Sequence, residues 1–166
     1  MTEHTEKQRY YYDACTLDLT ETYQEITNSK HCEAVVSFLA LGEAYGNTLL
    51  YKSEDQLDSF LKFISNLNKA SLIFIVGNDD VDHIADEIKA SKTGREMSTT
   101  DAIHFATAVR EKCSVFRTSD RDFHGCTGKE FAEVAQKYGA YGFSIQKIDL
   151  PKKSKYGQKI ARRLRK

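Results

Sequence analysis

Carboxylates recur in this sequence where a strand is expected to end or a helix to begin. Asp13 directly follows the aromatic, β-prone residues 9–12, and Asp120 follows the short β-prone residues 114–118. Ligands of open parallel sheets bind outside the carboxyl ends of the strands, so both acids lie where a site is expected. The other candidates are Glu43 in the second turn of a predicted helix, Asp101 in the first turn of another, and Asp122 close behind Asp120.

Converging carboxylates repel one another, and this repulsion must be relieved. Protonation relieves it by raising pKa values, whereas a bound divalent cation relieves it directly. Hard oxygen ligands select Mg²⁺ or Mn²⁺, and such an ion activates water and stabilises the charge that builds on a phosphoryl group during in-line attack. Thr118 and Ser119 are placed to add hydroxyl contacts to a bound water or phosphate.

Most of these acids also have an ordinary explanation. Asp101 fits a helix capping box with Ser98, Asp120 is a good turn former, and Glu43 fits a solvated helix face. Asp13 is harder to explain in this way, because it follows three tyrosines of a strand expected to lie centrally in a sheet. An acid there is costly without a partner.

Strand and helix patterns alternate along the chain. Helical spacing is predicted from Thr16, from Ser37, from the capping box of Ser53 and Gln56, and over residues 81–88, 98–113 and 127–138. Further strands are predicted at 33–37, at 71–76 as an apolar strand covered on both faces, and at 143–148 as an edge strand. The alternation predicts an α/β fold, a three-layer α/β/α sandwich with a mostly parallel sheet.

The chain of 166 residues is long enough for one domain with its own core. Its four cysteines show neither a CxxC pair nor zinc-like spacing, which favours reduced thiols. The polar N-terminus carries acids where a signal peptide needs an apolar run, and the longest apolar run, residues 72–76, is too short to span a bilayer. We therefore expect a soluble, cytoplasmic protein without a membrane segment.

The formal net charge of zero conceals an asymmetry. Residues 152–166 hold eight Lys or Arg and no acid, while residues 1–151 hold sixteen bases and twenty-four acids. The tail either attracts the phosphates of a nucleic acid or is simply solvated. We predict a disordered N-terminus over residues 1–8, one domain over 9–150 and a basic tail over 151–166.

Four segments resemble PIN-domain proteins of the VapC type: YYYDAC, SFLALGEAYG, STTDAIHFATA and FRTSDRDF. The resemblance covers roughly residues 9–148. It places Asp13, Glu43, Asp101 and Asp120 on the family's acidic metal-binding positions, and Asp122 on a more variable one. Family members are typically Mg²⁺- or Mn²⁺-dependent ribonucleases, often toxins paired with an antitoxin protein and often homodimers. Ala14 and Cys15 depart from the pattern, because a hydroxyl residue followed by Asn or Ser usually succeeds the first aspartate.

The resemblance implies a metal-dependent endoribonuclease that cleaves RNA. Two alternatives stay open: a catalytically weak PIN module that binds RNA or protein, and a DNA-directed nuclease. Nearby basic residues also have two interpretations. Arg117 and Arg121 would hold substrate phosphates or form surface ion pairs, while His104 and His124 are interpreted as structural, His104 lining or stabilising the cleft.

Overall fold

The structure, a computed structural model of the chain, describes residues 7–29, 32–91, 97–120, 123 and 128–148. Its strands are β1 (Gln8–Tyr12), β2 (Cys32–Ser37), β3 (Ile73–Val76), β4 (Val115–Thr118) and β5 (Ser144–Lys147). Its helices are the short 3-10 helix η1 (Ala14–Thr16) and α1 (Thr20–Asn28), α2 (Phe38–Tyr51), α3 (Glu54–Lys69), α4 (Asp82–Ala90), α5 (Thr99–Arg110) and α6 (Gly128–Lys137). The predicted basic tail and Asp122 lie outside the described residues, as do residues 1–6.

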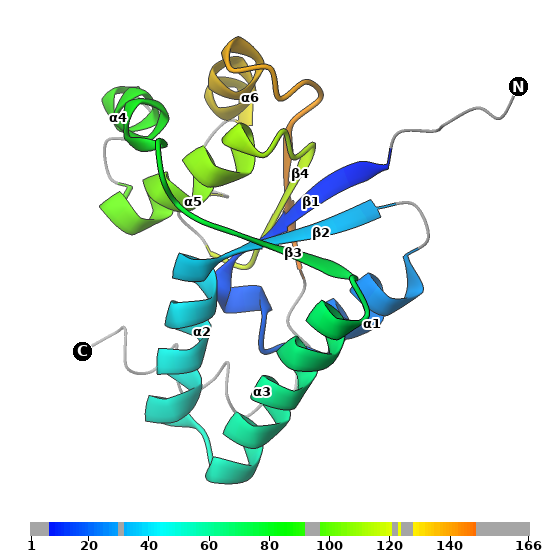
Figure 1. Cartoon of the computed structure of the whole chain (residues 1–166). Helices are drawn as coiled ribbons and strands as arrows, with labels where there is room; N and C mark the ends of the chain where they lie inside the picture. The colour runs from blue at the N-terminus through cyan, green and yellow to red at the C-terminus, as the bar shows by residue number, and fades with distance from the viewer. Residues whose placement is uncertain (1–6, 30–31, 92–96, 121–122, 124–127, 149–166) are drawn as a thin grey trace, which may run out of the picture.

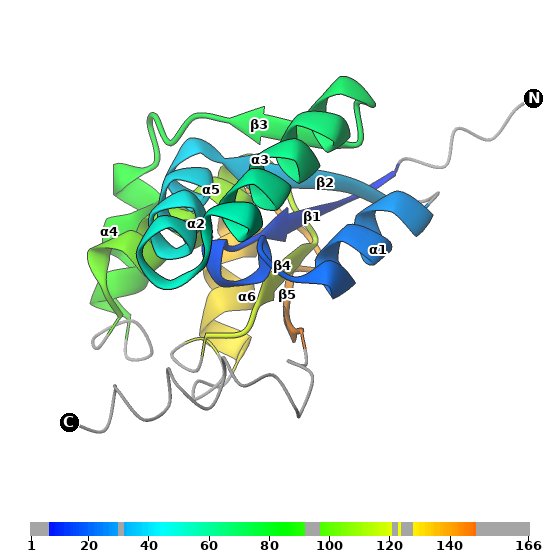
Figure 2. The ribbon, with the colours of Figure 1, turned by 90° about the horizontal axis from the view of Figure 1, so that it is seen from below.

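One five-stranded sheet organises the described part of the chain. Its strand order is β3-β2-β1-β4-β5, and every neighbouring pair is parallel. Figures 1 and 2 show helices on both faces of this sheet. The predicted three-layer α/β/α sandwich is therefore confirmed, and its sheet is wholly parallel. β1 lies at the centre, as expected for the strand that leads into Asp13.

Alternation along β1 and β2 divides the core into two layers. Tyr11 and Val35 pack with α4, α5 and α6 on one face, and Tyr12 and Val36 pack with α1, α2 and α3 on the other. Tyr11 and Tyr12 are completely buried. A strand that is buried on both faces holds its backbone firmly, and Asp13 is the next residue after it.

Two predicted elements differ from the structure. The helix expected from Thr16 begins at Thr20, because Asp13 caps the separate 3-10 turn of η1 and the chain bends before α1. The apolar strand at 71–76 is an edge strand and is not covered on both faces, since the Phe74 side chain is 43% exposed. The guanidinium of Arg9 lies 5.9 Å from the centre of the Phe74 ring and shields part of it.

Other predicted signals are confirmed. The reciprocal capping box of Ser53 and Gln56 starts α3, and Ser37 caps α2 by accepting a hydrogen bond from the backbone N–H of Ala40. β5 forms the other edge of the sheet. β1 begins at Gln8, one residue before the predicted start. Among the described helices, none is long and apolar enough to cross a membrane.

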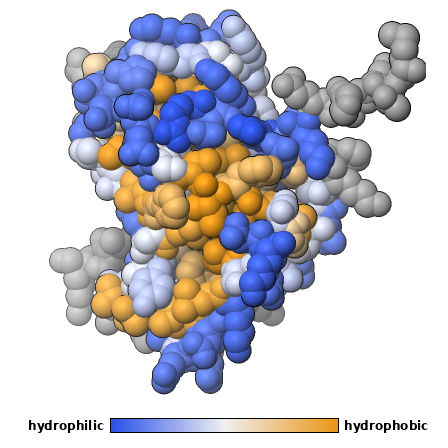
Figure 3. All heavy atoms as spheres, in the orientation of Figure 1, coloured by the Kyte–Doolittle hydropathy of each residue, from blue (hydrophilic) through white to orange (hydrophobic). Residues whose placement is uncertain are grey.

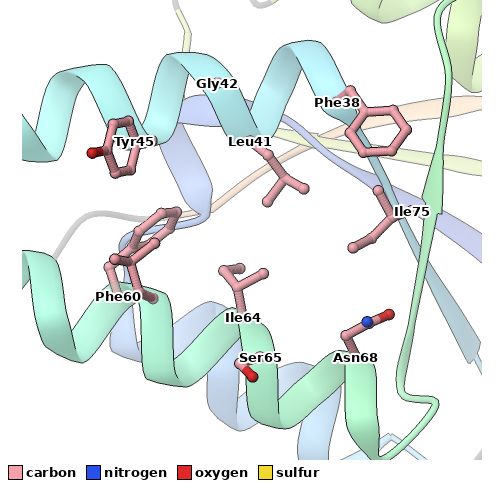
Figure 4. Close-up of a pocket in the computed structure, with 10 residues that line it drawn as sticks. Phe38, Leu41, Gly42, Tyr45, Phe60, Ile64, Ser65, Asn68 and Ile75 are labelled. Carbon is pink, nitrogen blue, oxygen red and sulfur yellow. The ribbon is translucent and has the colours of Figure 1, made fainter.

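An apolar groove runs between α2 and α3. Figure 4 shows Leu41 on α2 facing Ile64 on α3, with Ile75 of β3 nearby. Phe38 and Leu61 also line the groove and are 65% and 46% exposed. Figure 3 shows hydrophobic surface gathered over the area where β3, α2 and α3 lie in Figure 1. A contiguous exposed apolar surface of this kind typically marks an interaction site.

Candidate active site

Asp13 caps η1 from the carboxyl end of the central strand and is 4% exposed. Its Oδ1 accepts the backbone N–H of Ala14 at 2.8 Å, and its Oδ2 accepts the hydroxyl of Thr118 at 2.8 Å. The thiol of Cys15 lies 3.3 Å from the same Oδ2 and donates to it. The buried carboxylate therefore has the partners that its burial requires.

Thr118 links this carboxylate to the end of β4. While its hydroxyl donates to Asp13, its Oγ1 also accepts the backbone N–H of Asp120 at 3.0 Å. The backbone N–H of Ser119 donates to Cys15 Sγ at 3.2 Å. Asp13 and Asp120 thus follow adjacent strands at the same edge of the sheet, as predicted. The Thr118 hydroxyl thus holds an aspartate, and its contact with a bound water or phosphate stays a prediction.

Asp101 lies in the first turn of α5. The backbone N–H of Asp101 donates to Ser98 Oγ at 3.0 Å, and the Ser98 hydroxyl donates to Asp101 Oδ2 at 2.6 Å. Burial raises the pKa of Asp101, and the negative charges of Asp120 and Asp13 raise it further, against the lowering effects of Ser98 and His104. Asp101 is therefore both the capping partner of Ser98 and a member of an acidic group.

Glu43 joins this group through His104. His104 is 1% exposed, and its Nε2 lies 2.7 Å from Glu43 Oε2 and 3.7 Å from Asp13 Oδ1. Burial alone would lower the pKa of His104, but the hydrogen bond to Glu43 and the charges of Asp13, Glu43 and Asp101 together raise it. α2, α5 and the residue that follows β1 thus meet at one imidazole.

The four acids do not form a preassembled metal cluster. Within the ranges that the structure describes, no group of three or more His, Cys, Asp or Glu residues is arranged to hold a metal ion. Within the protein, the Asp13 carboxylate accepts hydrogen bonds from Thr118 and Ala14, and the Glu43 carboxylate contacts His104. The donor set nevertheless fits a hard divalent cation in its chemistry, because it consists of carboxylates. Burial raises the pKa of Asp101, and the charges of Asp120 and Asp13 raise it further.

Other predicted and unpredicted residues complete the description of the site. Arg117 forms an ion pair with Glu25 of α1 at 2.5 Å, so the ion-pair interpretation is confirmed for it. Asp122, Arg121 and His124 lie outside the described residues.

The sequence did not reveal that Tyr11 and Ser37 support His104: the Tyr11 hydroxyl lies 2.8 Å from both Ser37 Oγ and His104 Nδ1. In the sequence, Tyr11 is only one of three tyrosines of a strand expected to lie centrally in the sheet.

Cys15 is expected to resist alkylation in the folded protein. Burial raises its pKa to about 12, and the charge of Asp13 adds to the effect. At pH 8 its thiolate fraction should then be about 10⁻⁴, and the thiolate is the form that reacts. Mass spectrometry of peptides after iodoacetamide treatment should find Cys15 unmodified in native protein and modified in urea. Equal labelling in both states would contradict this expectation.

Three comparisons with known proteins bear on this site. The PIN domain family model matches residues 17–128, a range that contains Glu43, Asp101 and Asp120 and begins after Asp13. No curated protein matches the sequence. Among solved structures, the crystal structure of VapBC2 from Rickettsia felis bound to a DNA fragment from their promoter is similar to this chain, with a TM-score of 0.55 and 14% identity. That similarity covers 86% of this chain and all of the matched chain. This chain belongs to the PIN-domain family.

Proposed function

We propose that this protein is a metal-dependent endoribonuclease that hydrolyses RNA phosphodiesters. The observation that carries the proposal is the acidic group of Asp13, Asp101 and Asp120, which lies where β1 and β4 end and α5 begins. Burial raises the pKa of Asp101, and the charges of Asp120 and Asp13 add to that effect. PIN domains are generally nucleases, and membership of the family supports the same activity.

Asp13, Glu43, Asp101 and Asp120 would hold Mg²⁺ or Mn²⁺, with Asp122 as a further acidic ligand. When bound, the cation supplies an activated water and stabilises the charge that develops on the phosphoryl group. The protein contributes a fixed frame for these ligands. Thr118 holds Asp13 in one orientation, and the cap of Ser98 places Asp101 at the positive end of the α5 dipole, where a carboxylate is favoured.

The substrate is tested with matched strands. We expect the purified protein to cleave a fluorescent single-stranded RNA in Mn²⁺ or Mg²⁺, to stop in EDTA and to leave DNA of the same sequence intact. DNA cleavage at an equal rate would favour the DNA-directed nuclease. Tight RNA binding without metal-dependent cleavage would favour the binding module.

A toxin role and two protein partners belong to the same proposal. The similar solved structure is a VapBC2 complex, which supports an antitoxin as partner and a toxin as this protein's role. The exposed apolar residues along the groove between α2 and α3 offer surface for a protein contact, either with an antitoxin or within a homodimer. A cytoplasmic location accompanies this proposal, because RNA is the substrate.

A further inference from the structure

His104 of α5 belongs to a chain of hydrogen-bonded side chains that also contains Tyr11, Ser37 and Glu43. Its Nδ1 faces the hydroxyl of Tyr11 on β1 at 2.8 Å, and its Nε2 faces Glu43 of α2 at 2.7 Å. The Tyr11 hydroxyl also contacts Ser37 Oγ at 2.8 Å, and Ser37 is the N-cap of α2. These contacts therefore connect Ser37, at the N-terminal end of α2, with Glu43 of the same helix through Tyr11 and His104.

The direction of the bond to Glu43 follows from chemistry. A carboxylate can only accept hydrogen bonds, so His104 Nε2 carries the proton that Glu43 receives. In the neutral ring Nδ1 then accepts from the Tyr11 hydroxyl. The Ser37 hydroxyl can donate to Tyr11 while its oxygen accepts the N–H of Ala40. Every group in the chain has a partner, and the ring is held at both nitrogens.

His104 and Glu43 differ in how far they are buried. The side chain of His104 is 1% exposed, whereas that of Glu43 is 38% exposed. An exposed glutamate would otherwise be solvated and would sample several rotamers, each at little cost. The bond to a buried, doubly held imidazole instead keeps Glu43 in one orientation, on the side where Nε2 also lies 3.7 Å from Asp13 Oδ1.

We infer that His104 is a positioning residue that orients Glu43 toward Asp13 for cation binding, and that Tyr11 and Ser37 hold its ring. The inference rests on the proposed function, because it concerns the same acidic group. Partners that hydrogen-bond to the ligands of a metal typically change its affinity 10- to 100-fold when they are removed. His104 would act in this way without touching the metal.

Two amide substitutions separate orientation from packing. In His104→Gln the side-chain amide reaches the place of Nε2 and can still donate to Glu43. In His104→Asn the shorter amide reaches only the place of Nδ1, beside Tyr11. The two variants have similar polarity, and their melting temperatures in EDTA report any general damage to the fold. Mn²⁺ affinity, measured by electron paramagnetic resonance of the free ion, is the readout.

We expect His104→Asn to weaken Mn²⁺ binding by about 10-fold or more, and His104→Gln to stay within about threefold of the wild type. In a Glu43→Gln background, His104→Asn should weaken binding little further, because the group that it orients no longer carries the charge. Unchanged affinity in His104→Asn would overturn the inference, as would an equal loss in both backgrounds or an equal loss in both amide variants. Absence of saturable Mn²⁺ binding by the wild type would overturn the proposed function, and this inference with it.

Discussion

Replacing Asp101 with asparagine is expected to lower the rate of RNA cleavage by about 1000-fold, which corresponds to about 4 kcal/mol of transition-state stabilisation. The substitution removes one ligand charge, while its amide oxygen can still accept the Ser98 hydroxyl that Asp101 Oδ2 accepts at 2.6 Å. Single-turnover cleavage of RNA at saturating Mn²⁺ measures the effect. Asp55→Asn is a matched control, because Asp55 is an exposed acid in the first turn of α3.

The same substitution should leave the metal-free fold as stable as the wild type or more so. Because the folded-state pKa of Asp101 is raised, the wild type binds more protons folded than unfolded between its ordinary pKa and the raised one. Stability of the wild type then falls as pH rises through that window. In EDTA, the gain in stability of Asp101→Asn over the wild type should appear as the pH rises through the same window and be absent at lower pH. A variant that melts lower and still cleaves would show that Asp101 is only a capping residue.

Replacing Asp13 with alanine is expected to lower the free energy of unfolding by about 3 kcal/mol, even in EDTA. The substitution leaves the N–H of Ala14 and the hydroxyl of Thr118 without the acceptor that they share, and it removes the cap of η1. Urea unfolding measures the change.

The control for this prediction is Asp13→Asn. Its amide oxygen can still accept from Ala14, and its N–H₂ can donate to Thr118 Oγ1. We expect it to lose about 1 kcal/mol while losing the ligand charge completely. If the alanine variant unfolds at the same urea concentration as the wild type, the Asp13 carboxylate contributes nothing to the fold, and its contacts with Thr118 and Ala14 carry no net energy.

The sheet and its helices were largely predictable, since periodicity of apolar residues is a local property. The boundaries at α1 and β3 were not. Residues 16–19 are compatible with a helix by sequence, but the extended backbone of Leu19 (φ −92°, ψ 133°) interrupts the chain between η1 and α1. The apolar pattern of β3 cannot distinguish a central strand from an edge strand, because that depends on whether strands pair with it on both sides, and β3 pairs with β2 alone.

The places of the acids in the fold were predictable, and their hydrogen-bond partners were less so. Asp13, Asp101 and Asp120 follow from strand ends and a helix start, which are visible in the sequence. The contact of Tyr11 with His104 joins residues 93 positions apart, and no local sequence pattern predicts such a contact. The hydrogen bonds of Asp13 with Thr118 and of Glu43 with His104 were not predictable either, because they join residues 105 and 61 positions apart.

The position of β1 at the centre of the sheet has a consequence for how the protein is made. Strands β1, β2 and β3 emerge first from a ribosome and can pair with one another, but the partner of β1 on its other side is β4. The hydroxyl that holds Asp13 comes from Thr118, 105 residues later. At about 5 to 20 residues per second, several seconds of synthesis separate the two ends of this bond. The hydrogen bond between Thr118 and Asp13 therefore cannot form until most of the domain has been translated.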